Sequence, residues 1–431
     1  MLSYLCAIQN LQLEKVILAN KPAFIKQALY WANTHSHFAY YDSNQIEYPY
    51  DGFMHCMAVG SKRVLNEGQS PFRTLADFHK NAWLFGYLGY DLKNSIEKLQ
   101  SKNQDRLGFQ DLSFFEPEHL LIFEGDELII HSENTSLLQE IENFKPIQFN
   151  NKLSKPTESV SKAEYINTVN KLREHIEEGD CYEINYCQEF HGRLDEVDPI
   201  QLYSELNGIS PNPFSSLQKH NQHYIICASP ERFLKKTGKQ LISQPIKGTR
   251  PRDPNPIEDQ RLAKELRSDE KELAENMMIV DLVRNDLARS SEIGSVKVEE
   301  IFGIYSFHQV HQMISTIVAE KRDDVNWAEA IKNAFPMGSM TGAPKVKVMQ
   351  LIERYENTKR GPFSGAAGYI TPDGNFDFNV LIRSLFLNKE KSVYSFQVGS
   401  AITYDSIPEN EHDECMVKAK ALFSLLKRFE T

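Results

Sequence analysis

Two kinds of apolar pattern alternate along the chain. Short runs of apolar residues predict strands, and segments in which apolar residues recur every three or four positions predict amphipathic helices. We expect strands at 16–18, 120–123, 128–130, 181–190, 224–231, 239–243, 361–370, 376–387 and 394–403. We expect helices at 22–31, 161–178, 258–289, 346–352 and 408–418. The helix at 161 opens with a capping box, Ser161 to Glu164, and Gly179 ends it.

A polar stretch at 146–160 has neither the apolar runs of a strand nor the apolar spacing of a helix, so we interpret it as a linker. It separates an N-terminal region, 1–150, from a longer region, 160–431, and we expect the two to form one intertwined globular unit. Within the first region, the aromatic and glycine-spaced run 83–91 predicts a buried strand with close backbone neighbours.

Composition narrows the classes of function. The 431 residues are 41% hydrophobic and 25% charged, which is ordinary for a globular protein. The net charge of −11 argues against nucleic acid or an anionic membrane as a partner. No segment has the apolar length of a membrane span, and the first residues lack the pattern of a secretion signal. The six cysteines form no CxxC pair, so we expect reduced thiols in a cytoplasmic protein.

The stretch 244–252 is rich in groups that could carry chemistry. It contains Lys247 and Gly248, followed by two arginines. Because Pro245 limits how far the preceding strand can continue, we expect Lys247 to lie where the strand gives way to a loop. On these residues alone, the lysine is either an anion-binding group or, if its pKa is depressed, a nucleophile.

Glu231 ends the strand predicted at 224–231. A turn at 236–239 predicts a hairpin that brings Glu231 and Lys247 to the same end. A glutamate at a turn is usually a surface charge, but an acid beside an amine is a candidate catalytic pair.

Two predicted helices each carry a Glu-x-x-Glu pair, Glu272 with Glu275 and Glu411 with Glu414. The first pair borders a helical segment that is apolar on most sides, so we expect that segment to be buried. A charge there lowers stability unless it is paired. Either pair alone could be a solvated helix face. If the two face each other, they form an all-oxygen cluster suited to Mg²⁺.

Further candidates are weaker. The glycine-rich turn 335–345 leads into a helix and could cradle an anion, although it is not a Walker A loop. Tyr369 and Arg383 are polar groups in mainly apolar runs, and Gly399 would let a ligand approach the backbone. For these residues, and for His311, a purely structural role is the alternative.

Four segments, in this order, resemble the signature blocks of the chorismate-utilising enzymes: 245–250 (PIKGTR), 272–286 (ELAENMMIVDLVRND), 338–345 (GSMTGAPK) and 405–415 (DSIPENEHDEC). The resemblance runs from about residue 160 to the C-terminus. It implies an α/β (α+β) protein with a two-sheet antiparallel β core and helices outside. The residue periodicities are compatible with this fold but do not select it.

Within that family, Lys247 indicates the branch. Anthranilate synthases typically have alanine at this position, whereas component I of the aminodeoxychorismate synthases has Pro-Ile-Lys-Gly-Thr-Arg. The resemblance therefore implies Mg²⁺-dependent conversion of chorismate and ammonia into 4-amino-4-deoxychorismate, the precursor of 4-aminobenzoate and folate. It assigns Lys247 as the nucleophile and Glu231 as the general acid.

The same resemblance implies the other roles. Glu275 and Glu414 would bind Mg²⁺ directly, and Glu272 and Glu411 would act through water. The substrate-binding residues would be Thr341, Lys345, Tyr369, Arg383, Gly399 and His311. Two positions depart from the family pattern: Glu183 stands where a glutamine is common, and 337–340 reads Met-Gly-Ser-Met.

The chain has no Gly-x-Cys-x-Gly nucleophile elbow, so we expect a separate glutamine amidotransferase subunit to supply ammonia, with free ammonia as the alternative source. Three other functions remain open. They are anthranilate synthesis or another chorismate reaction, a non-catalytic ligand-binding homologue, and a Schiff-base lyase that uses Lys247.

Overall fold

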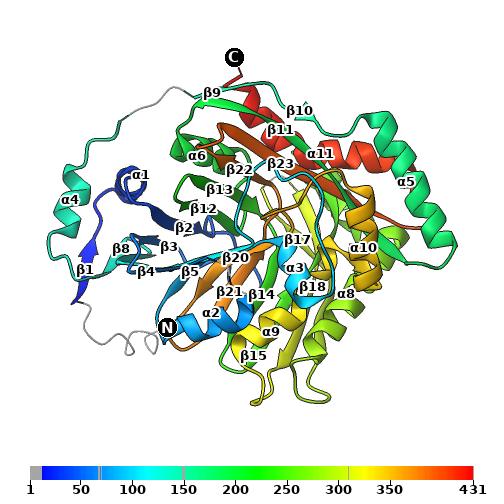
Figure 1. Cartoon of the computed structure of the whole chain (residues 1–431), viewed down its shortest axis with the longest axis horizontal. Coiled ribbons are helices and arrows are strands. Elements are labelled where there is room, and N and C mark those ends of the chain that lie inside the picture. Colours follow the sequence, from blue (N-terminus) through cyan, green and yellow to red (C-terminus); the bar gives the residue numbers. More distant parts are fainter. Residues whose placement is uncertain (1–11, 67, 69, 148–150, 309, 431) are drawn as a thin grey trace.

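The computed structural model describes residues 12–66, 68, 70–147, 151–308 and 310–430. Two large antiparallel sheets form its centre, with helices on the outside, as the sequence resemblance implied (Figure 1). One buried cluster contains Ile225 of the first sheet and Phe378 of the second, so the two sheets share a core. The described part of the chain has no helix with the length and apolar composition needed to cross a membrane.

The first sheet contains strands from both ends of the chain. In spatial order it consists of β1 (Gln12–Ile17), β8 (Glu127–Ser132), β7 (His119–Glu124), β3 (Cys56–Val59), β2 (His37–Asp42), β12 (Phe214–His220), β13 (His223–Ser229), β22 (Ser384–Asn388), β23 (Val393–Ile402), β11 (Glu183–Glu196) and β10 (Thr157–Glu158). Two short strands, β9 (Lys152–Leu153) and β19 (Gly342–Ala343), also pair with β11.

The second sheet likewise contains strands from both the N-terminal and the C-terminal regions. Its order is β16 (Ile246–Pro251), β18 (Val310–Glu320), β15 (Gln240–Gln244), β14 (Arg232–Thr237), β21 (Phe376–Val380), β20 (Ala366–Ile370), β5 (Leu84–Leu88), β6 (Leu112–Glu116) and β4 (Arg63–Asn66), and β17 (Lys297–Ser306) pairs with β18. The run at 83–91 contains the buried strand β5, and a Cβ atom on Gly86 would lie 2.0 Å from the Ser113 carbonyl oxygen.

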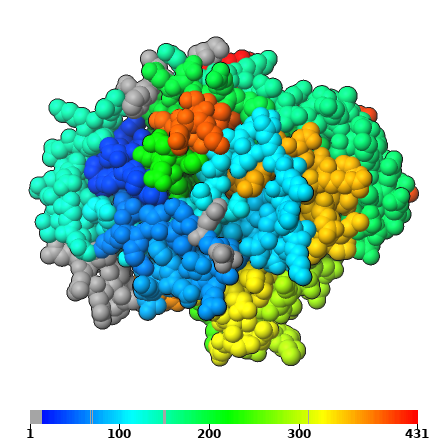
Figure 2. Space-filling view, viewed as in Figure 1, coloured from blue at the N-terminus to red at the C-terminus, as the bar shows by residue number. Residues whose placement is uncertain are grey.

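Helices cover the outside of the two sheets (Figure 1). They are α1 (Lys21–Ala32), α2 (Pro71–His79), α3 (Lys93–Ile96), α4 (Leu137–Asn143), α5 (Lys162–Glu177), α6 (Pro199–Ile209), α7 (Pro256–Ser268), α8 (Glu270–Ala288), α9 (Trp327–Ala334), α10 (Lys345–Tyr355) and α11 (Pro408–Lys427). The capping box of Ser161 and Glu164 is present at the start of α5. Figure 2 shows the blue and cyan N-terminal region lying directly against the yellow and orange segments of the C-terminal region.

Two of the places where the chain crosses between the sheets are adjacent. The chain leaves the first sheet between β13 and β14 and returns between β21 and β22. The Val380 amide donates to the Glu231 carbonyl (3.0 Å), and the Ala228 amide donates to the Arg383 carbonyl (3.3 Å). Residues 376–387, predicted as one strand, are therefore two, because the chain changes sheets at Arg383, where φ is +51°.

Lys247 lies in a strand and not in a loop, contrary to the sequence prediction. Pro245 separates β15 from β16 by only one residue, and both strands pair with β18. The Ser315 amide of β18 donates to the Pro245 carbonyl (3.2 Å), so the pairing continues past the proline. A proline lacks the amide hydrogen, so it removes one ladder hydrogen bond and leaves the following residues free to pair.

Two further boundaries differ from the predictions. The helix expected at 258–289 is two helices, because the Asp269 carboxylate accepts from the amides of Lys271 and Glu272 and caps the start of α8. The stretch 146–160 contains β9 and β10, so it is not an unstructured linker throughout; residues 148–150 lie outside the described residues. The five described cysteines are unpaired, and Cys6 lies outside the described residues.

Candidate active site

Lys247 forms a buried ion pair with Glu183. The Lys247 Nζ atom lies 2.7 Å from Glu183 Oε1, and the two side chains are 10% and 1% exposed. Gly248, which follows on β16, has φ +86°, and a Cβ atom there would lie 2.9 Å from Leu266. Glycine is thus needed to bring this strand against the helices. Burial would lower the pKa of Lys247, but the nearby carboxylates of Glu183 and Glu275 raise it above its ordinary value.

Glu231 lies at the sheet crossing beside Lys247, so the predicted meeting of acid and amine is confirmed. The Glu231 side chain is buried. Burial raises the pKa of Glu231 to about 7, although a hydrogen bond from Ser339 and the charges of Lys247 and Arg383 act in the opposite direction. Glu231 can therefore be protonated near neutral pH, as a general acid must be.

The two Glu-x-x-Glu pairs also meet, as predicted. The Lys271 Nζ atom lies 3.2 Å from Glu411 Oε1 and 3.7 Å from Glu275 Oε1. Burial raises the pKa of Glu275 to about 7, and repulsion from Glu183 and Glu272 adds to the rise. Burial also raises the pKa of Glu272, and the charge of Glu414 contributes to that rise. Carboxylates from α8 and α11 therefore lie close enough to repel one another.

These four glutamates, called the carboxylate cluster below, have the chemistry to hold a divalent cation. Oxygen ligands of this kind suit Mg²⁺. Glu411 is buried, and its Oε2 atom has no hydrogen-bond partner among the described residues. Among those residues, no three of the four glutamates bring one oxygen each within 4.8 Å of one another, whereas His175, Glu178 and Asp180 do. The Lys271 ammonium now supplies the positive charge between the two helices.

Several cations around the cluster already have anionic partners. Arg250 contacts Asp269 (2.5 Å) and Glu272 (3.2 Å). Arg252 contacts Asp259 (2.8 Å), so neither arginine is a free anion-binding group. Lys418 contacts Glu414 (2.7 Å) at the exposed edge of the cluster and donates to the Gly399 carbonyl (3.0 Å). This last contact ties Gly399 of β23 to α11.

Three predicted substrate-binding residues surround this region in different ways. The Thr341 hydroxyl donates to the Met337 carbonyl (3.0 Å), which stabilises the glycine-rich turn. Lys345, the first residue of α10, contacts Asp286 (2.5 Å). A Cβ atom on Gly399 would lie 2.4 Å from the Cys187 sulfur, so the neighbouring strand β11 already uses the space that this glycine leaves.

Two other predicted residues have partners elsewhere. Tyr369 lies in an aromatic cluster with Tyr41, Phe53 and Phe85, and its hydroxyl accepts a hydrogen bond from the Met54 amide (3.2 Å). The two ring nitrogens of His311 face Ser306 (2.7 Å) and Asp259 (2.9 Å). The substrate contacts proposed for these residues stay predictions. Arg383, by contrast, is half-buried and interacts electrostatically with Glu231.

Sequence reasoning missed three partners in the cluster. Lys271 precedes the first Glu-x-x-Glu pair, and this adjacency could have indicated it. Ser339, in the glycine-rich turn, donates to Glu231. The pairing of Glu183 with Lys247 had no local signal, because 64 positions separate the two residues.

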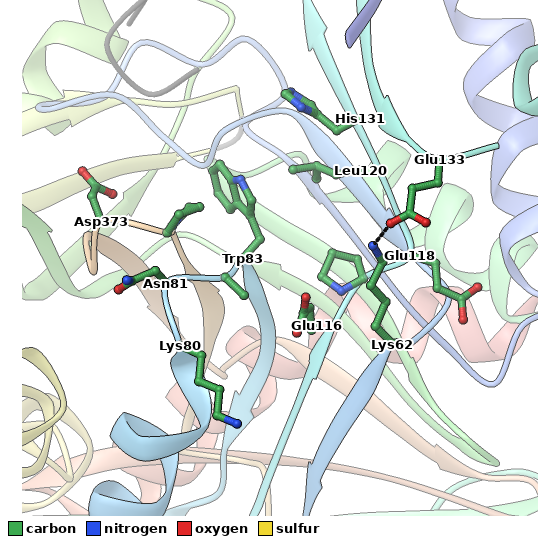
Figure 3. Close-up of a pocket in the computed structure, with 13 residues that line it drawn as sticks. Lys62, Lys80, Asn81, Trp83, Glu116, Glu118, Leu120, His131, Glu133 and Asp373 are labelled. Atoms are coloured by element: carbon green, nitrogen blue, oxygen red, sulfur yellow. Dashed lines mark hydrogen bonds and ion pairs between the residues drawn. The ribbon is translucent and has the colours of Figure 1, made fainter. Parts of the chain in front are cut away.

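A cavity of about 760 Å³ is lined mainly by residues of the N-terminal region, together with Pro372 and Asp373 (Figure 3). Its lining includes Trp83, His131 and the ion pair of Lys62 with Glu133, and it contains none of the predicted site residues.

The chain belongs to the chorismate binding enzyme family, whose model matches residues 19–424. It is thus an enzyme that acts on chorismate, with the two-sheet fold of that family. It is 32% identical to anthranilate synthase component 1 of Thermus thermophilus over 360 residues, which are 80% of this chain and 77% of the relative. It is 33% identical to aminodeoxychorismate synthase component 1 of Escherichia coli over 355 residues, which are 80% and 76% of the two chains.

Solved structures give the same fold. Anthranilate synthase component I of Streptococcus pneumoniae superposes with a TM-score of 0.78 at 24% identity, covering 88% of this chain and 94% of the other. The menaquinone-specific isochorismate synthase of Escherichia coli superposes with a TM-score of 0.77 at 18% identity, covering 97% and 95%. These relatives and solved structures thus include synthases of three kinds: anthranilate, aminodeoxychorismate and isochorismate synthases.

Proposed function

We propose that this chain is component I of an aminodeoxychorismate synthase, which converts chorismate and ammonia into 4-amino-4-deoxychorismate. The observation that carries this proposal is the position of Lys247, buried beside Glu231 and the carboxylates of α8. An amine at this point can form a covalent bond to the substrate ring. The 33% identity to the Escherichia coli aminodeoxychorismate synthase component 1 is compatible with the proposal, although the identity to an anthranilate synthase component 1 is similar.

In the proposed reaction, the neutral amine of Lys247 forms a bond to ring carbon 2 while the bond between carbon 4 and its hydroxyl breaks. Glu231 gives its proton to the departing oxygen, which leaves as water. Ammonia then forms a bond to carbon 4, and the bond from carbon 2 to Lys247 breaks. The proximity of the buried Glu231 to Lys247 supports this pairing of a proton donor with an amine.

Mg²⁺ would be held by Glu275 and Glu414 directly, with Glu272 and Glu411 acting through water. When bound, it would supply positive charge for the ring carboxylate of chorismate. Arg383 would face the other carboxylate, on the enolpyruvyl group. Thr341, Lys345, Tyr369, Gly399 and His311 are the remaining residues that we assign to substrate binding.

The proposal also covers where the ammonia comes from and in which compartment the enzyme acts. We expect a separate glutamine amidotransferase subunit to supply ammonia, and we expect the enzyme to act in the cytoplasm, within 4-aminobenzoate and folate synthesis.

The product identifies the reaction. Purified protein is incubated with chorismate, Mg²⁺ and ammonium, and the products are separated by chromatography. We expect a compound that yields 4-aminobenzoate only after a lyase is added. Fluorescent anthranilate would instead assign the anthranilate reaction. No turnover, with or without an amidotransferase, would favour a non-catalytic homologue, and trapping by borohydride would indicate a Schiff base.

A further inference from the structure

The buried pair of Lys247 and Glu183 poses a chemical problem for the proposed reaction. A lysine can attack carbon only as a neutral amine, because the ammonium form has no lone pair. The charged groups that face Lys247 from every element packed against it are Glu183 on β11, Glu231 at the sheet crossing, Glu275 on α8, and Glu414 and Lys418 on α11. Four of these five groups are acids, and together they favour the ammonium form.

Glu183 is the group placed to receive the surplus proton. Its Oε1 atom lies 2.7 Å from Lys247 Nζ. Its Oε2 atom is buried and has no hydrogen-bond partner among the described residues. A carboxylate with one unused oxygen can take up a proton without losing another hydrogen bond. Among the described residues, no hydrogen bond or ion pair joins Lys247 or Glu183 to the four glutamates of α8 and α11.

We propose that Glu183 is the general base that removes the proton from Lys247 before the lysine attacks chorismate. This inference rests on the proposed function. The N–H bond of the ammonium breaks, an O–H bond forms on Glu183, and the freed electron pair forms the bond from nitrogen to carbon 2. When that bond later breaks, the electron pair returns to Lys247, which takes back the proton from Glu183.

The residue type at position 183 is essential to this role. A glutamine, common at this position in the family, could accept a hydrogen bond from the ammonium through its amide oxygen, but it is not a base at neutral pH. Removing the carboxylate therefore leaves water as the acceptor for a proton held in a buried site.

The test compares Glu183→Gln with the wild-type enzyme across pH 6 to 10. At pH 7 we expect the variant to aminate chorismate about 100-fold more slowly, the scale of one general base. The deficit should shrink as pH rises, because solvent then removes the proton from Lys247. Glu183→Asp, which keeps the carboxylate, should recover part of the rate.

A matched control is Glu189→Gln, the same change at another buried position of β11. Glu189 contacts Arg106 (3.0 Å) and Ser395, outside the cluster. We expect this variant to keep the wild-type pH profile. A wild-type rate and pH profile in Glu183→Gln would overturn the assignment of the base.

Two further measurements separate this inference from the proposed function. If Lys247→Ala aminates chorismate as fast as wild type, the covalent route itself fails. Carbamylation of Lys247 by cyanate, followed by peptide mass spectrometry without substrate, reports the proton on the amine directly. We expect slower labelling in Glu183→Gln than in wild type at pH 8, because the amine then has no adjacent carboxylate to take its proton. Equal labelling would show that Glu183 does not control this proton.

Discussion

Glu231 shows at the scale of one residue how burial selects a chemical role. The sequence places this glutamate at a turn, where most glutamates are solvated and ionised. In the structure it lies between two sheets, and burial raises its pKa to about 7. An acid with this pKa is partly protonated at neutral pH and can donate to a leaving hydroxyl.

The pH dependence of Glu231→Gln tests this role. We expect wild-type turnover to fall as pH rises above about 7, the pKa of Glu231 in the folded protein. The variant should lose about 100-fold in turnover and show no such fall, because it has no acid to titrate. Equal pH profiles in the two proteins would exclude Glu231 as the acid.

The same shift has a consequence for stability. The pKa of Glu231 rises from 4.5 to about 7, so the protonated form is favoured in the folded state. Its contribution to the free energy of unfolding is therefore full below pH 4.5 and is lost as pH rises through 7. Compared with wild type, Glu231→Gln should be relatively more stable at pH 8 than at pH 5, as measured by urea unfolding.

At the scale of elements, the start of α8 decides where the first glutamate pair lies. The Asp269 carboxylate accepts from the amides of Lys271 (3.1 Å) and Glu272 (3.2 Å) and also contacts Arg250. A cap of this kind satisfies amides that have no partner within the helix. It therefore fixes the first turn, which carries Lys271 and Glu272.

We expect Asp269→Ala to lower the free energy of unfolding by about 1 kcal/mol, since the helix loses its cap. Asp281→Ala on the same helix is the control, because Asp281 is 61% exposed and contacts only Arg284 among the described residues. Its effect should stay below about 0.5 kcal/mol. Equal losses in urea unfolding would show that the cap adds no stability.

At the scale of the whole molecule, the carboxylate cluster needs both α8 and α11. The two helices lie more than a hundred positions apart in the chain, and Lys271 and Glu411 link them by an ion pair (3.2 Å, 140 positions apart). Burial is the main cause of the raised pKa of Glu275 and Glu272, and a cation bound between the helices would relieve the repulsion that adds to it. Metal binding should therefore stabilise the folded protein.

We expect a chelator to abolish turnover and Mg²⁺ to restore it. Glu275→Gln and Glu414→Gln should each raise the Mg²⁺ concentration needed, on the order of 10-fold or more. Glu178→Gln, in the separate group of His175 and Asp180, should not change it. Thermal unfolding with and without Mg²⁺ gives a readout that is independent of turnover. An unchanged Mg²⁺ requirement in both site variants would reject the proposed ligands.

Several elements were predictable because local patterns determine them, whereas the two-sheet architecture was implied only by the family resemblance. The capping box of Ser161 and Glu164, the buried strand at 83–91 and the approach of Glu231 to Lys247 were all predicted correctly. Two of the errors arose where a single residue redirects the chain. Asp269 divides a long helical pattern, and Arg383 divides a long apolar run because the chain changes sheets there. Neither the helix boundary nor the change of sheet alters the spacing of apolar residues, so the sequence pattern does not show them.

The sequence by itself determined the types of group in the site: an amine at 247, an acid at 231 and two glutamate pairs. These follow from residue identity and from spacing along single elements. Only the tertiary structure decided that Glu183 is the partner of Lys247 and that Glu231 is buried enough to hold a proton. The physical reason is that charge states depend on burial and on neighbours from distant strands and helices, which only the packing of the whole chain brings together.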